Sequence, residues 1–348
     1  MKWTISSFIK DQWTAVPPVV QADLTGKTVI VTGANNGIGF EAAKHFARMN
    51  PGKLILACRS KERGQAALDE LKEETGCKTA ELWILDLASF DSVKAFADKF
   101  NKEGGRLDIL VENAAVTPSE PVRTTSDGWE ETLHVNNLST SLLALLLLPR
   151  VIQTANDYKT TPRIVIVSSE VHYMTQLQNE LMESPNPLET FGKSADYIEK
   201  VKGVRYEDSK LLNVFFTRSL SERLPLPEGK VIVNTVNPGY CYSGLRGNWT
   251  GLRKVFDYFM EKALARTSEE GARQLVWAAV GGEDEPDNLH GAYVSLAKVV
   301  EPSDYVLSVE GQQHANKIWD NLLDELRQVE PKVQHIVDEC LQAIPTVV

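Results

Sequence analysis

From Lys27 onward, the chain alternates short apolar runs with longer amphipathic segments. Nearly continuous Val, Ile and Leu in each run is typical of strands that are covered on both faces. The runs are TVIVT (28–32), KLILA (53–57), ELWIL (81–85), LDILV (107–111), RIVIV (163–167) and KVIVN (230–234), and HGAYVSLA (290–297) is a candidate last strand. This rhythm predicts an α/β fold with one doubly wound parallel sheet flanked by helices.

The pattern predicts one domain with extensions, because the chain contains no internal repeat and no Gly/Ser-rich linker. The expected parts are an N-terminal arm (1–23), a main domain (24–300) that includes an insert (171–204) and a small substrate-binding lobe (240–285), and a C-terminal helical extension (301–348). Two amphipathic segments within 311–343, divided near Pro331, predict helices with a structural role or a subunit contact. The arm packs on the body, covers the pocket or lies on a membrane surface, and composition does not choose among these.

Composition narrows the class of protein. An apolar share of 43%, a charged share of 24% and a net charge of −10 are typical of a globular protein without a nucleic-acid partner. The four cysteines show no CxxC pair and no metal-ligand spacing, so we expect no metal site. The longest apolar run, 142–148, is far shorter than the roughly 20 residues of a membrane span, and we expect a cytoplasmic protein.

A glycine-rich stretch, TGANNGIG (32–39), follows the first strand and precedes a helical pattern. Glycines there allow a tight turn close to a pyrophosphate, and the helix N-terminus offers free N–H groups. The candidate contacts in this stretch are Gly33, Asn35, Asn36, Gly37, Ile38 and Gly39. The context predicts dinucleotide binding, and the alternative is a merely structural turn.

The end of the second strand indicates which dinucleotide binds. NAD sites usually carry an acidic residue there, but this chain has Arg59 in the run Ala57-Cys58-Arg59-Ser60-Lys61. A guanidinium can stack on adenine and pair with a 2′-phosphate, with help from Lys61 or Arg63. We therefore expect NADP as the cofactor, against the alternative of a solvated surface arginine.

Further cofactor contacts are expected at the ends of the next two strands. Asp86 and Leu87 close the third strand, where an acceptor could meet the adenine amine. Asn113 and Ala114 follow the fourth strand, where small residues would let the backbone lie against a ribose. Each is also an ordinary turn residue when considered alone.

Carbonyl reduction needs a proton donor, and a tyrosine whose phenolate is stabilised by a nearby cation can serve. A Tyr and a Lys four residues apart share a helix face, and the chain contains two such pairs, Tyr206…Lys210 and Tyr258…Lys262. We favour Tyr206 as the acid/base and Lys210 as its activator, because their helix lies between the RIVIV and KVIVN strands.

Two polar residues complete the expected catalytic group. Ser169 ends the RIVIVSS strand, where its hydroxyl could hold the substrate oxygen, whereas Ser168 would point to the opposite side. Asn136 enters an apolar helix, where its amide could hold a water that connects Lys210 to solvent. The alternatives are a strand-end cap for Ser169 and a helix hydrogen bond for Asn136.

The motifs in this order resemble the short-chain dehydrogenase/reductase family. They are TGANNGIG, DL at 86–87, NA at 113–114, VN at 135–136, SS at 168–169, YEDSK at 206–210 and NPGYCYSGL at 237–245. LACRSKERG (56–64) and the long insert look like the retinol-dehydrogenase-like branch, fungal members included. The resemblance covers about 24–300 and implies a Rossmann-type sheet.

The resemblance also implies roles for particular residues. The active tetrad would be Asn136, Ser169, Tyr206 and Lys210, with Tyr206 and Lys210 also at the cofactor. Ser243 would contact the cofactor amide after the Pro238-Gly239 turn. Glu112 stands where the family's first Asn of N-N-A-G is usual, and Ala115 replaces its Gly.

The remaining segments predict the substrate and the assembly. The insert and the lobe offer a set able to line an apolar pocket, of which several should simply be core: Tyr173, Met174, Phe191, Tyr240, Tyr242, Trp249 and Phe256. They predict a bulky apolar alcohol or ketone, and His172 is expected to be a surface or satisfied histidine. The family often pairs through helices at 126–150 and 206–224, which implies a homodimer unless the arm or the tail blocks that surface.

The sequence thus predicts an NADP-dependent oxidoreductase that acts on an alcohol or ketone carbon, with a fungal-type role in tailoring a terpenoid or polyketide implied by the resemblance. A regulator that senses NADP(H) without turnover is the alternative from another class, but such a protein would be expected to lose Tyr206 or Lys210. A nucleotide-sugar epimerase is disfavoured by the glycine spacing and by the absence of a basic diphosphate patch.

Overall fold

A computed structural model describes residues 4–343 apart from 225–229, 247–250 and 283, and it describes no side chains at 246 and 251–257. Its centre is an eight-stranded sheet with the order β3-β2-β1-β4-β5-β6-β7-β8. The strands are β1 (Thr28–Thr32), β2 (Lys53–Cys58), β3 (Ala80–Ile84), β4 (Ile109–Glu112), β5 (Arg163–Val167), β6 (Ile232–Asn237), β7 (Tyr293–Ser295) and β8 (Lys298–Val300). All neighbours pair in parallel except β7 and β8, which pair antiparallel.

The predicted doubly wound sheet is confirmed, with two differences at its β8 end. The run predicted at 230–234 forms β6 a few residues later, at Ile232–Asn237, and the run at 290–297 gives only the short β7. After β7 the chain reverses at Leu296 and Ala297, which both have positive φ, and returns as β8. The sequence pattern did not predict this antiparallel edge strand, because β8 is only three residues long.

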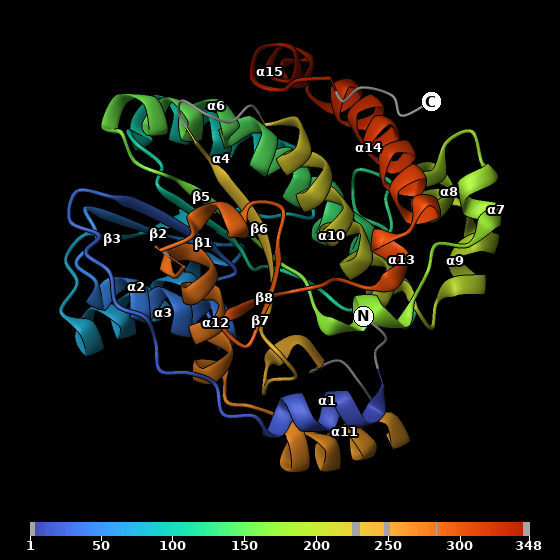
Figure 1. Ribbon diagram of the computed structural model, residues 1–348, viewed down its shortest axis with the longest axis horizontal. Helices are drawn as coiled ribbons and strands as arrows, with labels where there is room; N and C mark the ends of the chain where they lie inside the picture. The colour runs from blue at the N-terminus through green and yellow to red at the C-terminus, as the bar shows by residue number, and fades with distance from the viewer. Residues whose placement is uncertain (1–3, 225–229, 247–250, 283, 344–348) are drawn as a thin grey trace.

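Helices cover both faces of the sheet (Figure 1). One face carries α2 (Gly37–Arg48), α3 (Lys61–Thr75) and α12 (Ser268–Val280), and the other carries α4 (Phe90–Lys99), α6 (Thr140–Tyr158) and α10 (Arg205–Arg223). Each face has its own buried core, as the continuous apolar strands require. A short helix, α5 (Glu131–Leu133), and a π-helical stretch, η2 (His134–Ser139), lead directly into α6.

The continuous helix at 131–158 has the length and apolar composition of a membrane span, but most of it is buried in the fold. Residues Leu142 to Leu148 are all buried, in the core that also contains strand residues such as Ile30 and Ile164. Packing inside the molecule therefore accounts for the apolar run.

The C-terminal extension forms the two helices predicted on either side of Pro331. They are α14 (Val309–Val329) and α15 (Lys332–Cys340), preceded by the short α13 (Asp304–Leu307). Helix α14 packs on α10, and α15 packs on α6 (Figure 1). These contacts cover the two helices through which the resemblance implied a homodimer.

The insert is mostly helical and lies beside the extension. It contains a short 3-10 turn, η3 (Glu170–Met174), and the helices α7 (Asn179–Glu183), α8 (Pro187–Lys193) and α9 (Ala195–Val201). Helix α8 packs on α14, where the Leu188 N–H donates to Asn321 Oδ1 at 2.8 Å. This part of the insert therefore supports the C-terminal helices.

The N-terminal arm forms α1 (Ile5–Trp13), which lies beside α11 (Gly251–Leu264) on the face of the molecule opposite α14 (Figure 1). A capping box begins the helix, since Thr4 Oγ1 accepts from the Ser7 N–H at 3.0 Å and Ser7 Oγ accepts from the Thr4 N–H at 2.9 Å. The arm is thus folded and packed on the body, which is one of the three placements left open by its composition.

Candidate active site

A cavity of about 890 Å³ opens at the carboxyl ends of the central strands. Ligands bind at this edge in open α/β sheets. Apart from Lys61, which was offered as an alternative to Arg63, the residues predicted to contact the cofactor line this cavity: Gly33, Asn35, Asn36, Gly37, Ile38, Gly39, Arg59, Asp86, Leu87, Asn113, Tyr206, Lys210, Pro238, Gly239 and Ser243. The fold thus brings together residues that are spread over the chain.

The glycine-rich turn has the shape that a closely approaching phosphate needs. Gly33 and Gly37 have positive φ, at 67° and 57°. A Cβ on Gly39 would lie 2.3 Å from Asn113 Nδ2 and 2.7 Å from the Gly33 oxygen. The Asn36 side chain makes no capping hydrogen bond at the start of α2, so the helix end presents backbone N–H groups to the cavity.

The contact between β1 and β4 keeps the floor of the cavity in place. The N–H groups of Asn113 and Ala114 both donate to Thr32 Oγ1 at 3.0 Å, and Asn113 Nδ2 donates to the Thr32 oxygen at 3.0 Å. Glu112 does not line the cavity, and burial without a hydrogen-bond partner raises the pKa of its carboxyl well above the ordinary range. Glu112, which stands where the family usually has Asn, is therefore buried as a neutral carboxylic acid beneath the floor of the cavity.

Positive side chains lie at the adenine end of the cavity. Arg59 follows β2 with an exposed side chain, and Arg63, in the first turn of α3, lines the cavity as well. Lys61, the other cation considered from the sequence, does not line it. The local charge is positive although the chain as a whole carries −10.

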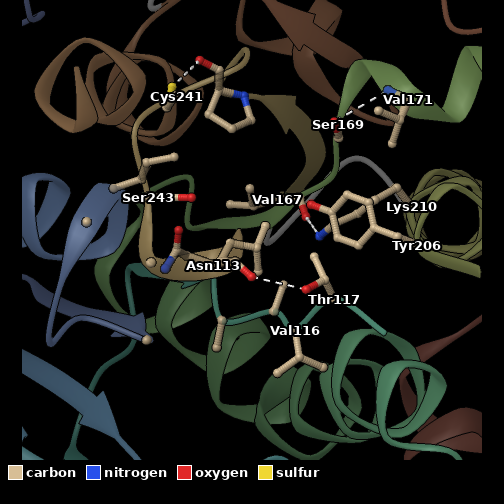
Figure 2. Close-up of a pocket in the computed structure, with 18 of the residues that line it drawn as sticks. Asn113, Val116, Thr117, Val167, Ser169, Val171, Tyr206, Lys210, Cys241 and Ser243 are labelled. Atoms are coloured by element: carbon tan, nitrogen blue, oxygen red, sulfur yellow. Dashed lines mark hydrogen bonds between the residues drawn. The ribbon is translucent and has the colours of Figure 1, made fainter. Parts of the chain in front are cut away.

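Tyr206 and Lys210 project from α10 into the cavity on the same helix face (Figure 2). Lys210 Nζ lies 5.6 Å from the centre of the Tyr206 ring and donates to the Val167 oxygen at 2.9 Å. Lys210 is 2% exposed, and burial without an anionic partner lowers the pKa of its ammonium to about 7. A buried cation at this distance stabilises negative charge that develops on the tyrosine oxygen.

Ser169 also lines the cavity, two residues after the end of β5, on the same side of the view as Tyr206 and Lys210 (Figure 2). Its hydroxyl also accepts weakly from the Val171 N–H, at 3.4 Å. Ser168, the preceding residue, donates its hydroxyl to the Lys210 oxygen at 2.7 Å and so ties β5 to α10. Both serines line the cavity, but the Ser168 hydroxyl is bonded to the backbone of α10, whereas the Ser169 hydroxyl has only the weak contact with Val171.

Asn136 lies behind the cavity, in the π-helical stretch before α6, and does not line it. Its Oδ1 accepts from the Val116 N–H at 2.8 Å, and its Nδ2 donates to the Val116 oxygen at 2.9 Å and to Ser209 Oγ at 3.0 Å. The amide therefore connects the loop after β4 to α10. Its role as a holder of water stays a prediction.

The second tyrosine–lysine pair lies elsewhere. Tyr258 and Lys262 share a face of α11, with Lys262 Nζ 4.7 Å from the ring centre, but neither lines the cavity. Tyr258 is 51% exposed. The same spacing thus gives a surface contact in α11.

A buried ion pair fixes the start of α10. Arg205 Nη2 donates to Glu130 Oε2 at 2.5 Å and to the Phe191 oxygen at 3.0 Å. Glu130 in turn accepts from the N–H groups of Thr132 and Leu133 at the start of α5. Because Arg205 directly precedes Tyr206, this network positions the tyrosine.

The predicted pocket-lining set divides between cavity and core. Met174 and Tyr240 line the cavity, whereas Phe191 is buried in the core and Tyr242 is 40% exposed outside the cavity. Tyr173 donates its hydroxyl to the Glu301 oxygen and does not line the cavity. Trp249 lies outside the described residues, and the side chain of Phe256 does too.

His172 is a satisfied core histidine. Its Nδ1 donates to the Ser169 oxygen at 2.7 Å, and its Nε2 accepts from the Ser303 N–H at 3.2 Å. Burial lowers the pKa of its imidazole to about 4. The ring is therefore neutral and supports the backbone of Ser169 from behind.

Several cavity residues were not singled out as such from the sequence. They include Ile5, Phe8 and Ile9 of α1, Glu170 after Ser169, and the loop 116–120 after β4. Adjacency to Ser169 and Asn113, at strand ends that bind ligands, could have indicated the last two. The spacing of Ile5, Phe8 and Ile9 fits one face of a helix, but such spacing does not show what that face packs against.

Comparisons with known proteins agree with this geometry. A family model described as "short chain dehydrogenase" matches residues 27–179. The chain is 37% identical over 318 residues to a short chain dehydrogenase/reductase, dmxR8, of a Cryptosporiopsis species, covering 91% of this chain and 95% of that protein. It is also 37% identical over 334 residues to the short-chain dehydrogenase anuD of Penicillium roqueforti, covering 94% of this chain and 84% of that protein.

A solved structure shares the fold at lower identity. A putative short chain dehydrogenase from Escherichia coli CFT073, complexed with NADPH, superposes with a TM-score of 0.55 at 21% identity. The match covers 79% of this chain and 98% of that one.

Proposed function

Because the chain belongs to the short-chain dehydrogenase/reductase family, we propose that it is an NADP(H)-dependent oxidoreductase acting on a bulky apolar alcohol, ketone or aldehyde. The observation that carries this proposal is that Ser169, Tyr206 and Lys210 line the same cavity as the glycine-rich turn. Hydride transfer and proton transfer both need such a juxtaposition.

The cavity suits a dinucleotide that carries an extra phosphate. The uncapped start of α2 and the close approach of Gly39 to Asn113 make a cradle for a pyrophosphate. Arg59 and Arg63 offer planar cations where a 2′-phosphate would lie. The Escherichia coli protein of the same fold was solved with NADPH, which supports this choice.

The chain's own residues handle the proton and the substrate oxygen. A bound nicotinamide would supply or accept the hydride. In the reductive direction, Tyr206 donates its hydroxyl proton to the oxygen that becomes the alcohol, and Ser169 orients that oxygen by a hydrogen bond. In the oxidative direction the same tyrosine oxygen accepts the proton.

Lys210 makes this proton transfer easier by its charge. Burial disfavours its ammonium as long as no negative charge lies nearby, which is why its pKa is lowered to about 7. Negative charge that develops on Tyr206 during turnover favours the ammonium, and the ammonium favours the phenolate in return. The pair is therefore mutually stabilised only when the reaction requires it.

Apolar side chains in the rest of the cavity support the proposed substrate class. Met174, Tyr240, Leu245 and Val122 line it together with the catalytic groups, so an apolar body fits beside the reacting carbon. The proposal extends to tailoring a terpenoid or polyketide, the role that the resemblance to fungal members of the family implied; the relatives described above are fungal short-chain dehydrogenases.

The test is consumption of NADPH and NADH with a panel of bulky and small ketones. We expect turnover with NADPH, and we expect Tyr206→Phe to abolish it. Tyr258→Phe is the matched control, because it removes the same hydroxyl from the other tyrosine–lysine pair. Cofactor binding without turnover on any carbonyl or alcohol would contradict the enzyme proposal and favour an NADP(H)-sensing regulator.

The cofactor preference has its own test. Arg59→Glu should lower kcat/KM for NADPH relative to NADH by at least about tenfold, the loss of one charge-assisted pair. Lys61→Glu makes the same charge change two residues away, outside the cavity, and should leave the preference nearly unchanged. Equal effects of the two variants would show that general surface charge, not Arg59, sets the preference.

A further inference from the structure

Helix α1 forms one wall of the cavity that holds Tyr206 and Ser169. Ile5, Phe8 and Ile9 recur three and four residues apart, which places them on one helix face, and all three line the cavity. Ile5 is 68% exposed, and Phe8 and Ile9 are half-buried. The apolar face of α1 therefore keeps solvent-accessible surface on the cavity.

Apolar side chains from α11 and from the loop after β6 complete this wall. Tyr240, Met260 and Leu264 line the same cavity, and the rings of Phe8 and Tyr240 meet edge to face with centres 6.5 Å apart. We call the set Ile5, Phe8, Ile9, Tyr240, Met260 and Leu264 the α1 subsite. None of its side chains is charged, so it favours an apolar occupant.

Polar contacts at the C-terminal end of α1 fix the helix to the body. Gln12 Nε2 donates to Glu170 Oε1 at 3.2 Å, and Glu170 directly follows Ser169. Trp13 Nε1 donates to the Ala263 oxygen at 3.3 Å, and the buried Arg266 guanidinium donates to the Asp11 oxygen. The α1 subsite thus has a defined position relative to the catalytic serine.

We propose that the α1 subsite holds the apolar body of the substrate while Ser169 and Tyr206 hold its oxygen. The proposal rests on the proposed function, because both use the same cavity. It makes the N-terminal arm, which precedes the sheet, a determinant of substrate size. Phe8 and Ile9 contribute most, because their side chains are more buried than that of Ile5.

The experiment compares the Phe8→Ala/Ile9→Ala double variant with wild type on a series of ketones of increasing apolar size. We expect KM for the bulkiest ketones to rise at least about tenfold, with kcat, the dissociation constant of NADPH and the kcat/KM of the smallest ketone each within twofold of wild type. Lys10→Ala is the matched control, since this exposed residue of α1 lies outside the cavity. Circular dichroism melts verify that each variant is folded.

A second readout separates this proposal from the proposed function. Binding of a bulky ketone to the NADPH-loaded protein is measured by calorimetry, which needs no turnover. Weaker binding by the double variant supports the α1 subsite even if the wild type reduces nothing. The proposal for the α1 subsite would be overturned if the double variant bound the bulky ketone as tightly as wild type, or if it lost affinity equally for small and bulky ketones.

Discussion

The buried ammonium of Lys210 should lower the free energy of unfolding of the protein. Burial moves its pKa from 10.5 to about 7. At about 1.4 kcal/mol per pKa unit, this corresponds to roughly 5 kcal/mol of unfavourable free energy when the folded protein keeps the ammonium charged. Replacing the side chain by an apolar one of similar length removes this cost.

The perturbation is Lys210→Met, and the assay is urea unfolding of the cofactor-free protein. The variant loses the hydrogen bond from Nζ to the Val167 oxygen, worth about 1 kcal/mol. Asn213 Nδ2 still donates to that oxygen, at 3.4 Å. We therefore expect the variant to be inactive and more stable than wild type by about 2–4 kcal/mol at pH 7.

The pH dependence gives the sharper test. Between pH 7 and 10.5 the unfolded chain binds a proton at Lys210 that the folded chain does not, so wild-type stability rises with pH across this window. The difference in free energy of unfolding between Lys210→Met and wild type should therefore shrink by roughly 2–3 kcal/mol from pH 7 to pH 9.

Lys262→Met is the control, because Lys262 is exposed in the other tyrosine–lysine pair and its replacement should change little at either pH. A variant at Lys210 that is less stable than wild type at pH 7, or whose advantage does not depend on pH, would refute the reasoning.

Three further predictions concern the surroundings of the site. Gly39→Ala should raise the dissociation constant of NADPH about tenfold or more in a fluorescence titration, because its methyl group would collide with Asn113 Nδ2 and force the turn to shift. Glu170→Gln should remove a pH dependence of the free energy of unfolding. Burial raises the pKa of this carboxyl from 4.5 to about 7, so the folded protein binds a proton there that the unfolded chain does not. Between pH 4.5 and pH 7 the wild type should therefore lose up to about 3 kcal/mol of stability relative to the variant, measured from urea midpoints. Arg205→Met should cost about 3–5 kcal/mol in urea unfolding by leaving the buried Glu130 carboxylate unpaired, and stability equal to wild type would contradict a positioning role for the pair.

The central sheet and the cofactor end of the site were predictable from the sequence for a physical reason. Parallel strands buried on both faces are continuously apolar, and their carboxyl ends converge on one edge. Residues directly after these strands, such as Arg59 and Asn113, therefore gather around one cavity whatever the length of the connecting helices. For these residues, the position in the sequence directly after a strand is enough to predict the position at the cavity.

The substrate end was less predictable, because its contacts join distant segments. Tyr173 and Met174 are neighbours, yet only Met174 lines the cavity, since the direction of each side chain depends on the turn after Ser169. Phe191 fills the core beneath the insert, which a count of aromatic residues cannot distinguish from a pocket wall. The pairing of α1 with Tyr240, Met260 and Leu264 has no signature in either segment alone.

The covering of α6 and α10 by α15 and α14 has a consequence for how the protein behaves on dilution. The rings of Phe216 and Trp319 stack with centres 5.9 Å apart, and Arg223 lies over Trp319, so part of this cover is aromatic and closely packed. A surface covered by another subunit is exposed again when the concentration falls below the dissociation constant. Here the cover is tethered to the same chain, and its local concentration is set by the connection and not by the number of molecules present. The apolar faces of α6 and α10 should therefore stay protected in a nanomolar solution as well as in a concentrated one.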